Sequence, residues 1–575
     1  MKALGATLGE EFVPGSNLKG AVEGANWCFL LPSLEIGRVV SVGAPSPSAL
    51  ATLSRLSNEI VVWAPSRDLR RLRSVIGGEG SNKISLVETD GGPIPLPDGS
   101  ADVMLLARHG LAASLSHDAT TRDEFERVLK PGGVAYAEFR PSFHRLATAR
   151  AVERAFGSLG RPQVVWLAPA FGEMRAAASR ADGPSIAYLE RGFLTRSLLR
   201  LHLVRRPGRV LGRHVLTNRV FGRCGALASR PEIDLAGGPP DYLRSVAAKA
   251  GVRIERGRWG FAAPGDYRSQ KLLFFIFTGT KETPDSVVKM TREPKLNPRL
   301  EREWHALTLL QERGIGDEGT VPRPLFFGRH ADLAIVGETA VDGVPFRERT
   351  QATADCPYAR DVVDWLLELG RLTAHPQPTG SPVIAAWLEA LLARFVELYR
   401  VDSVHSDFLA GQVAAIARSE KDLPLVFQHG DPGPWNLMVT PEGRPAFLDW
   451  EAADLDGMPL WDIFHFFRSF GFAISRRTGR NDPMRSLTEQ VLADSDLSRL
   501  IVKATTRFCA ATGLLPELVE PLFYLCWMHR ALKEAPRLPP ARLETGRYVN
   551  VLRRAIDQRD SPGLRRLFSL SATAG

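Results

Sequence analysis

The chain has 575 residues, of which 44% are hydrophobic and 24% charged, and this length exceeds what one ordinary hydrophobic core supports. We therefore expect about two to four domains. No apolar run reaches the roughly 20 residues that a helix needs to cross a bilayer. The N-terminus also lacks a basic start followed by an apolar core. We therefore expect no transmembrane helix and no secretory leader, and we predict a cytoplasmic protein.

The net charge is +9, but the basic excess lies in one segment. Residues 191–230 contain ten Arg and no Asp or Glu, whereas the rest of the chain has 63 basic and 64 acidic residues. The basic character is therefore local and does not belong to the whole molecule. Because no recognition motif accompanies the segment, we expect no nucleic-acid partner.

The five cysteines do not form a disulfide framework or a zinc-binding pattern. Their number is odd, they are scattered, and none belongs to a Cys-x-x-Cys pair. We expect core thiols at Cys28, Cys224, Cys356, Cys509 and Cys526.

The first half of the sequence alternates apolar strands with helices. Short apolar runs predict strands, and amphipathic runs between them predict helices. The strands are expected at 37–43, 59–65, 100–106 and 134–140, and the helices at 48–56 and 123–133. This alternation is typical of an α/β fold with a parallel, doubly wound, Rossmann-like sheet.

Residues 25–190 resemble class I S-adenosylmethionine-dependent methyltransferases, most specifically in IPLPDGSADVMLL and EFERVLKPGGVAYAEF. In that family a glycine-rich loop after the first strand and an acidic residue after the second strand bind the cofactor. Here only Gly43 remains of the loop, Pro45 and Pro47 replace expected glycines, and VVWAPS carries no carboxylate. Proline allows neither close backbone approach nor a positive φ. We therefore predict a degenerate methyltransferase-like domain with Gly43 as a vestige, and no S-adenosylmethionine binding.

The arginine-rich segment leaves two interpretations open. Within residues 193–206, leucines and arginines fall on different faces of a predicted helix, which ends at Pro207. One interpretation is a helical connector over 191–240 that packs on neighbouring domains. The other is a peripheral contact of 191–230 with the anionic inner face of a membrane.

A Pro/Gly-rich stretch at residues 230–243 marks the main predicted boundary. Beyond it the pattern changes to hairpins, with a turn at GDYRSQ (265–270), and then to helices. Strands are predicted within 252–264, 271–280, 285–293 and 331–343, and a helix at 297–314. Asn297 is the expected N-cap of that helix. Lys289 is unusual because it lies in an apolar strand, where its ammonium must reach a polar group.

Residues 245–535 resemble the aminoglycoside phosphotransferase/choline kinase family, small-molecule relatives of protein kinases. HGDPGPWN matches the family's H-G-D-x-x-x-x-N catalytic loop, and FLDWE matches its metal-binding strand end. The resemblance implies a bilobal protein-kinase-like fold, ATP and Mg²⁺ as cofactors, and phosphate transfer to a hydroxyl. After Asp449 comes Trp-Glu, with no Ala-Pro-Glu segment. We therefore expect a small-molecule acceptor rather than a protein.

The resemblance also implies roles for the matching residues. Asp431 is the predicted catalytic base, and Asn436 and Asp449 are the predicted magnesium ligands, because phosphoryl transfer needs a positioned alcohol and a divalent cation on the phosphates. His429 and Asp462 are expected to support the loop.

The ATP-binding residues follow in the same way. They are expected to be Lys289, Glu303, Gly265, Glu338 and Ala340. Lys289 would contact the α- and β-phosphates, with Glu303, or less favourably Glu301, holding its ammonium. Gly265 would lie in the turn over the phosphates, and residues 338–340 would form the hinge that meets adenine.

The acceptor is less constrained, because relatives act on aminoglycosides, choline, ethanolamine, homoserine and sugars. Possible acceptor-binding residues are Glu451, Asp454 and Asp456. They would either meet a cationic acceptor or form a solvated acidic loop. Nearby tryptophans, Trp435, Trp450 and Trp461, would either frame an ammonium group or pack in the core.

Three functions fit these observations. The first is an ATP-dependent phosphotransferase that acts on a hydroxyl of a sugar, amino alcohol or aminoglycoside-like molecule. The others are a bifunctional kinase/methyltransferase in glycan or lipid biosynthesis and a non-catalytic pseudokinase scaffold. The predicted segments are 1–24 (N-terminal segment), 25–190 (methyltransferase-like), 191–240 (Arg-rich connector), 241–345 (kinase N-lobe) and 346–575 (kinase C-lobe with the catalytic loop).

Overall fold

The computed structural model describes most of the two halves. It describes residues 23–139 and 238–570, apart from 46, 74–75, 77–80, 90–91, 108–118, 255–257, 264–270, 280, 282, 317–318, 378–381 and 420–421, and between these stretches 159, 163–167, 176–178 and 223–229. Two compact units are present. The sheet unit comprises Ser16–Leu300 and Pro324–Ala340, and the helical unit comprises Glu301–Arg323 and Val341–Gly575. The five segment boundaries predicted above stay predictions.

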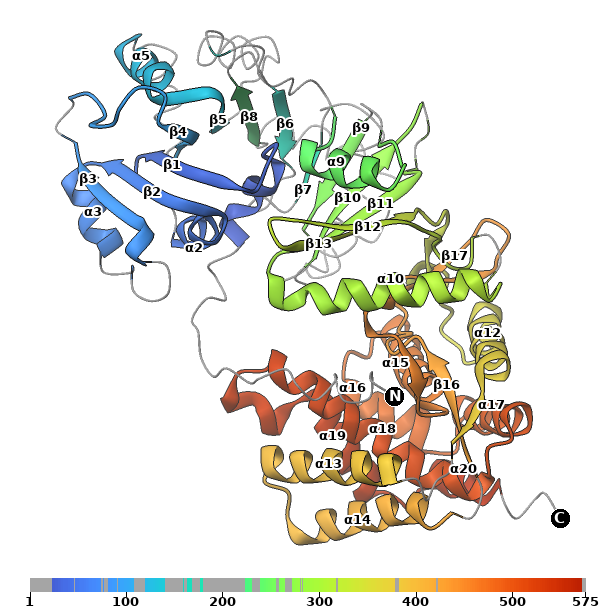
Figure 1. Ribbon diagram of the computed structural model, residues 1–575. Coiled ribbons are helices and arrows are strands. Elements are labelled where there is room, and N and C mark those ends of the chain that lie inside the picture. Colours follow the sequence, from blue (N-terminus) through green and yellow to red (C-terminus); the bar gives the residue numbers. More distant parts are fainter. Residues whose placement is uncertain are drawn as a thin grey trace. The chain divides into compact units, whose positions relative to one another are not determined.

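The sheet unit begins with five parallel strands in the order β3-β2-β1-β4-β5. The strands are β1 (Ile36–Val42), β2 (Ser57–Ala64), β3 (Ile84–Glu88), β4 (Ala101–Leu106) and β5 (Leu129–Phe139), and the helices between them are α2 (Pro47–Leu56), α3 (Ser66–Arg73) and α5 (Ala119–Val128). The expected parallel α/β sheet is therefore present (Figure 1).

Side-chain alternation along these strands builds a core on each face of the sheet. Val39 and Leu105 belong to the cluster that includes α2 and α3, whereas their chain neighbours Val40 and Met104 belong to the cluster that includes α5. Successive residues of a strand point to opposite faces. Because successive residues of these strands are apolar, both faces of the sheet are hydrophobic, which explains why helices cover both.

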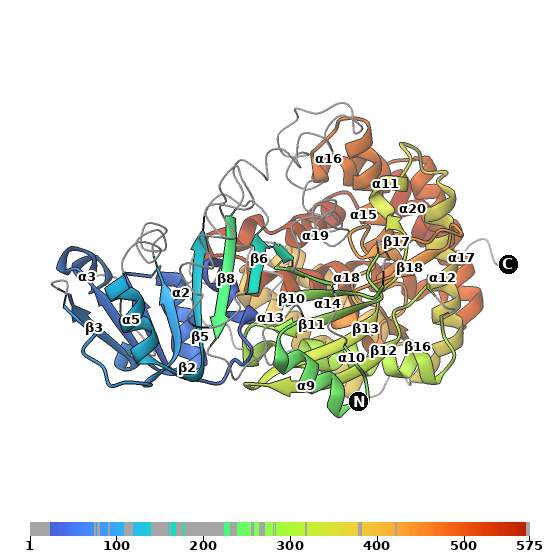
Figure 2. The ribbon, with the colours of Figure 1, turned by 90° about the horizontal axis from the view of Figure 1, so that it is seen from above.

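Antiparallel strands extend this sheet on the β5 side. They follow in the order β8 (Arg223–Ser229), β6 (Gln163–Leu167), β7 (Ala176–Ala178), β9 (Arg258–Ala262), β10 (Lys271–Phe277), β11 (Ser286–Thr291), β13 (Leu333–Thr339) and β12 (Pro324–His330). Figure 2 shows β5, β8 and β6 side by side. The strands of the predicted kinase N-lobe thus continue the N-terminal sheet, because β7 pairs with β9 from Ala176↔Ala262 to Ala178↔Gly260.

Side-chain contacts also join the two parts of the sheet unit. They involve the 3-10 helix η2 (Glu23–Leu30) and helix α9 (Asp241–Lys249). The hydroxyl of Tyr242 donates to the carbonyl of Phe29 at 2.8 Å, and its ring stacks on His330 at 4.9 Å. The backbone amide of Leu34 donates to Nε2 of His330 at 3.0 Å.

The helical unit surrounds two small sheets, β14-β17-β18 and β15-β16-β19. Its strands are β14 (Val344–Pro345), β15 (His375–Gln377), β16 (Leu423–Gln428), β17 (Leu437–Val439), β18 (Pro445–Phe447) and β19 (Asp454–Gly457). Its helices are α11 (Phe346–Arg349), α12 (Pro357–Thr373), α13 (Pro382–Tyr399), α14 (Ser403–Ala417), α15 (Trp461–Arg477), α16 (Pro483–Leu487), α17 (Asp496–Thr512), α18 (Val519–Glu534), α19 (Arg547–Asp557) and α20 (Pro562–Phe568). Helix α10 (Asn297–Glu312) spans the boundary between the units.

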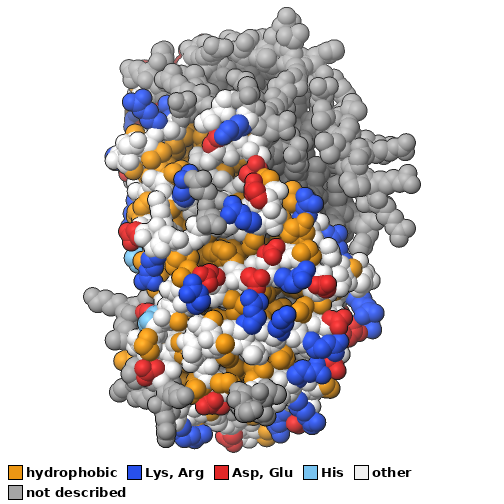
Figure 3. All heavy atoms as spheres, turned by 90° about the vertical axis from the view of Figure 1, so that its right-hand side faces the viewer, with side chains coloured by type: hydrophobic (Ala, Val, Ile, Leu, Met, Phe, Trp, Pro, Cys, Tyr) orange, Lys and Arg blue, Asp and Glu red, His pale blue; other side chains and the backbone are white. Residues whose placement is uncertain are grey.

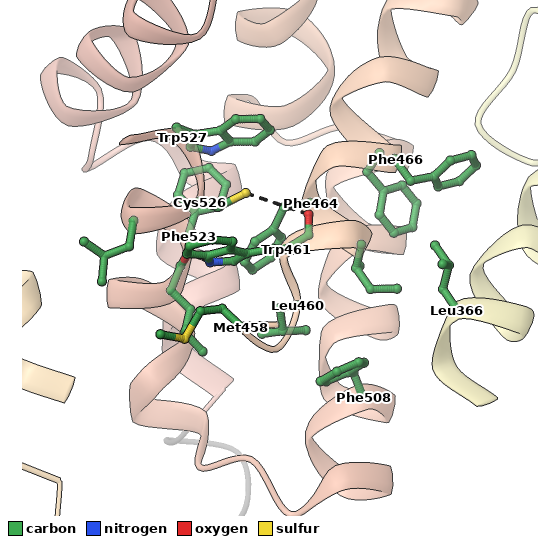
Figure 4. Packing of buried hydrophobic residues seen from close by; sticks show 14 of the residues in the cluster. Leu366, Met458, Leu460, Trp461, Phe464, Phe466, Phe508, Phe523, Cys526 and Trp527 are labelled. Atoms are coloured by element: carbon green, nitrogen blue, oxygen red, sulfur yellow. Dashed lines mark hydrogen bonds between the residues drawn. The ribbon is translucent and has the colours of Figure 1, made fainter. Parts of the chain in front are cut away.

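The core of the helical unit fixes α15 against α18. Trp461 and Phe464 of α15 pack on Phe523, Cys526 and Trp527 of α18 (Figure 4). The thiol of Cys526 donates to the carbonyl of Trp461 at 3.7 Å, and the rings of Phe464 and Phe523 meet edge to face. Burial of such large side chains contributes roughly 1.5–3 kcal/mol each, so the two helices hold a fixed register.

Two local expectations were wrong, and one strand was not predicted. The helix predicted at 123–133 ends at Val128, because Leu129 already pairs with Ala101 and a register shift accommodates the Pro-Gly-Gly that follows. Strand β3 was not expected. Asn297 does not cap α10: its Oδ1 accepts from the hydroxyl of Thr291 at 2.7 Å and the amide of Ala334 at 2.9 Å. Its side chain ties the helix start to two strands instead.

Several other expectations meet the structure only in part. Cys28, Cys356, Cys509 and Cys526 are buried free thiols, as expected, while the side chain of Cys224 lies outside the described residues. The Gly265 turn and the helix predicted at 193–206 also lie outside them. None of the helices described here is long and apolar enough to cross a membrane. On the face shown in Figure 3, basic and acidic side chains are interspersed.

Candidate active site

The predicted catalytic loop leaves β16 and is anchored from α15. Asp462, in the first turn of that helix, accepts hydrogen bonds from the backbone amides of His429 at 2.7 Å and Gly430 at 3.1 Å. Gly430 has φ of 78°, and a Cβ there would collide with the carbonyl oxygen of Ala452. The loop can therefore turn here only with glycine, and the turn delivers Asp431.

His429 connects the loop to the neighbouring strand. Its Nδ1 accepts from the amide of Asp431 at 3.2 Å, and its Nε2 lies 3.0 Å from the carbonyl oxygen of Leu448. A ring nitrogen that accepts carries no proton, so the ring donates to Leu448 from Nε2. The structure thus places His429 where a brace was predicted.

The side chain of Asp431 meets four partners. His465 Nε2 lies 2.9 Å from Oδ1, and Arg530 Nη1 lies 3.5 Å from the same oxygen. Oδ2 accepts from Trp435 Nε1 and from Asn436 Nδ2, both at 3.1 Å. Asn436 Nδ2 also donates to the backbone carbonyl of Asp431 at 3.0 Å.

These partners keep the predicted base ionised. Burial by itself raises the pKa of Asp431, but the hydrogen bond from His465 and the charge of Arg530 outweigh it and hold this pKa well below its usual range. Burial, together with the charge of Arg530, lowers the pKa of His465 to about 3. At neutral pH the pair is therefore a carboxylate and a neutral imidazole that donates from Nε2.

The predicted magnesium ligands lie at the same end of one hairpin. Asn436 directly precedes β17, Asp449 follows β18, and Leu437 pairs with Phe447 across the two strands. Asp449 has φ of 68°, a left-handed conformation that Asp and Asn tolerate better than most residues. The amide nitrogen of Asn436 is used by Asp431, so its amide oxygen is the atom suited to a cation.

Asn436 and Asp449 together match the way in which proteins usually bind Mg²⁺, which is seldom held by protein ligands alone. Within the described ranges, no three His, Cys, Asp or Glu side chains come together as a metal site. Mg²⁺ usually takes one or two protein oxygens and completes its shell with water and phosphate. Asn436 and Asp449 would supply the protein oxygens.

The nucleotide-binding predictions have mixed geometric support. In the sheet unit, Lys289 Nζ pairs with Glu338 Oε1 at 2.7 Å, and both side chains are buried. In the predicted hinge at 338–340, the backbone N–H of Ala340 donates to the carbonyl of Asp285 at 3.0 Å; the contact of the hinge with adenine stays a prediction. In the helical unit, Glu303 Oε1 accepts from the amide of Trp450 at 3.0 Å. The pairing of Lys289 with Glu303 stays a prediction.

The residues suggested for acceptor binding lie on β19 and in the short turn before it. Asp456 Oδ1 lies 3.0 Å from Nε2 of His375 on β15, and its amide donates to Asp454 Oδ1 at 3.2 Å. Glu451 lies in the short turn η7 (Trp450–Ala452). The three tryptophans differ in burial. Trp450 and Trp461 are buried in the core, whereas Trp435 is exposed beside Asp431.

The loop after β1 contrasts with this site. Gly43 has φ of 90°, and its amide donates to the carbonyl of Trp63 at 2.9 Å. Pro45 is buried, and Pro47 is the first residue of α2, a position that suits proline because its missing N–H is not needed there. The prolines are therefore part of the local fold.

Two residues of the site were not found from the sequence. His465 lies three residues after Asp462 on α15, so helical spacing places both on one face; this was the available signal. Arg530 comes from α18 and also donates to the carbonyl of Gly430 at 2.7 Å. Nothing in the local sequence marks it.

Residues 273–481 match the model of the Phosphotransferase enzyme family. The second half of the chain contains a phosphotransferase-family domain. The matched residues include Lys289, Asp431, Asn436 and Asp449, and the family implies use of ATP and Mg²⁺. No curated protein matches the chain.

Solved structures of three kinds are similar to this chain. An aminoglycoside phosphotransferase from Streptomyces rimosus is 18% identical with a TM-score of 0.27, over 44% of this chain and 90% of that one. The choline kinase LicA from Streptococcus pneumoniae is 14% identical with a TM-score of 0.29, over 52% of this chain and 92% of that one. The bifunctional kinase-methyltransferase WbdD is 12% identical with a TM-score of 0.23, over 100% and 97%.

Proposed function

We propose that the second half of the chain transfers the γ-phosphate of ATP to a hydroxyl of a small molecule, as a bilobal kinase-like enzyme. The observation that supports this most is the ionised Asp431 carboxylate, which follows the Gly430 turn and bonds to Asn436. The β17–β18 hairpin places Asn436 and Asp449 at the same end. The family match over residues 273–481 agrees with this chemistry.

In the proposed reaction, Asp431 orients the acceptor hydroxyl and receives its proton. The acceptor oxygen forms a bond to the γ-phosphorus, the bond from that phosphorus to the β,γ-bridging oxygen breaks, and ADP leaves. Magnesium, when bound, neutralises the phosphate charge; Asn436 and Asp449 would hold it. Lys289 would contact the phosphates. Because such transition states are loose, positioning and charge matter more than a strong base.

The test is ADP release from the purified chain with Mg²⁺ and ATP across a panel of sugars, amino alcohols and aminoglycosides. Asp431→Asn keeps the shape of the side chain and is the control. We expect acceptor-dependent ADP release that the substitution abolishes. Release that survives in Asp431→Asn would contradict Asp431 as the base, and the absence of Mg²⁺-dependent ATP binding would favour a scaffold.

A second candidate joins this kinase activity to methyl transfer. The strand order β3-β2-β1-β4-β5 with helices on both faces favours a methyltransferase-like fold for the first half. The loop after β1 argues against cofactor binding, because Pro45 is buried where an approaching ligand would need open backbone. We therefore propose a first half that keeps this fold without binding S-adenosylmethionine.

Peripheral membrane contact through residues 191–230 is a separate proposal. It rests on the ten arginines of this segment and the absence of acidic residues within it. Anionic headgroups attract such clusters by roughly 1 kcal/mol per basic residue near the surface. Flotation of the protein with liposomes that contain anionic lipid tests it, and a protein that stays at the bottom of the gradient would leave the packing interpretation.

A further inference from the structure

Four N–H groups face the Asp431 carboxylate. Oδ1 accepts from His465 and lies 3.5 Å from the guanidinium of Arg530, and Oδ2 accepts from both Trp435 and Asn436. A hydroxyl that is to lose its proton to Oδ2 therefore competes with two donors already in place.

Three of the four donors are fixed. His465 is fully buried, and Arg530 is buried and bound to the carbonyl of Gly430. Asn436 makes a second bond to the backbone of Asp431, and its own amide donates to Gly433. Displacing any of them would leave other polar groups unpaired in a buried site, which costs more than the bond itself.

Trp435 differs from these three donors. It is 48% exposed, and its N–H donates to Asp431 Oδ2. Trp450 and Trp461, by contrast, are 0% and 5% exposed. An exposed donor that swings away returns to water, which satisfies its N–H at little cost.

The indole is nevertheless held in a defined place. A Cβ on Gly433 would collide with the six-membered ring of Trp435, so the ring lies directly against that glycine. Its centroid lies 5.8 Å from that of His465, with the two rings nearly perpendicular at 73°. The aromatic ring is therefore packed on the loop beside the carboxylate that its N–H covers.

We propose that Trp435 is a removable cap on Asp431, and that the acceptor hydroxyl takes the place of its indole N–H on Oδ2. The cap keeps water from the same position while no acceptor is bound, so it suppresses hydrolysis of ATP. The occupant is an alcohol small enough to reach Oδ2 past the indole. This inference rests on the proposed phosphotransferase function.

Two substitutions break the bond between Trp435 and Asp431 by different routes. Trp435→Phe removes the donor and keeps an aromatic ring. Gly433→Ala keeps the indole and pushes it off the loop, and Gly433 does not have the positive φ that would itself strain alanine. Trp387→Phe, on α13 and away from Asp431, is the matched control for loss of an indole.

The measurement is ADP release from the full chain with Mg²⁺ and ATP and no acceptor. We expect a rise of about tenfold in Trp435→Phe and in Gly433→Ala, equivalent to about 1.4 kcal/mol in the barrier, and no change in Trp387→Phe. Water then forms the bond to the γ-phosphorus, its proton goes to Asp431, and ADP leaves. Adding Asp431→Asn to Trp435→Phe should remove the rise.

The outcomes separate the two proposals. Rates in Trp435→Phe and Gly433→Ala at or below the wild-type rate, with unchanged melting temperatures, would overturn the cap while leaving the phosphotransferase proposal intact. A rise that persists after Asp431→Asn would also overturn it. A wild-type chain that releases no ADP with any acceptor would instead contradict the proposed function.

Discussion

Two strands in this protein are each followed by a glycine with a positive φ, but the loops that follow differ. Gly43, with φ of 90°, comes directly after β1, and Gly430, with φ of 78°, comes two residues after β16. The first is followed by alanine and a buried proline, the second by Asp431. A sharp turn after a buried strand is thus a general device for presenting a loop, and the residues after the glycine decide what the loop can do.

The two turns also differ in what supports them. The amide of Gly43 is used by a neighbouring strand, through the carbonyl of Trp63. The amide of Gly430 is held by the carboxylate of Asp462 on a helix, and its carbonyl by Arg530 on another. The second turn is held by charged side chains, which cost free energy to bury. Such a cost is expected where the loop performs chemistry.

The largest effect should come from replacing Asp449, one of the two predicted magnesium ligands. Asp449→Asn removes a charge but keeps a residue that tolerates φ of 68°. We expect acceptor-dependent ADP release to fall at least about a hundredfold, because a preorganised charge near the phosphates is lost. Asp364→Asn, whose exposed aspartate pairs with Arg507, is the matched control and should stay active. Equal activity of the two variants would contradict the assignment.

The glycine comparison can be tested directly. Gly430→Ala should abolish activity and destabilise the fold, because its Cβ meets the carbonyl of Ala452 and its φ is left-handed. Gly43→Ala carries the conformational cost of a left-handed alanine, about 1–2 kcal/mol, and should release ADP normally. Urea unfolding and the ADP assay measure the two effects. Loss of activity in Gly43→Ala would break the contrast between the turns.

The contact of His465 with Asp431, in the loop after β16, predicts that stability depends on pH. The pKa of His465 falls from 6.5 to about 3 on folding. Below pH 6.5 the unfolded chain therefore takes up a proton that the folded chain does not, and stability falls as the pH drops from 6.5 toward 3. At pH 5 this amounts to about 2 kcal/mol.

Replacing this histidine isolates its contribution. His465→Gln keeps an N–H donor for Asp431 but does not titrate, so it should lose less stability than the wild type between pH 7 and pH 5. Urea midpoints at the two pH values provide the measurement. Parallel losses in the two proteins would show that His465 does not carry the effect.

The smallest expected signal concerns the β1 turn. Titration of the full chain with S-adenosylmethionine in a calorimeter should give no binding heat, because Pro45 is buried after Gly43. A dissociation constant below about 100 μM would contradict this and would revive the bifunctional enzyme.

Local sequence was enough to predict what lies close along the chain. Asp431 and Asn436 are five residues apart, and a hairpin brings Asp449 to the same end as Asn436. The parallel strands likewise followed from short apolar runs between helices. These features depend on turns and on side-chain alternation, which a sequence shows directly.

Tertiary packing decided the rest. Arg530 reaches Asp431 because α18 packs on α15, and Lys289 meets Glu338 because β11 pairs with β13 in one register. The exposure of Trp435, against the burial of Trp450, depends on how the loop lies over Gly433. None of these outcomes has a local signal, because each depends on how separate elements pack together.

The pairing of β7 with β9 gives the first half a structural role that needs no ligand. If the chain were cut between these two strands, β9 would become an edge strand with a row of unpaired N–H and C=O groups. Such an edge invites intermolecular pairing, so the isolated second half should aggregate. The loss would also affect β11, which carries Lys289 and lies two strands from β9 in the sheet. The N-terminal sheet thus covers its neighbour's edge whether or not it has chemistry of its own.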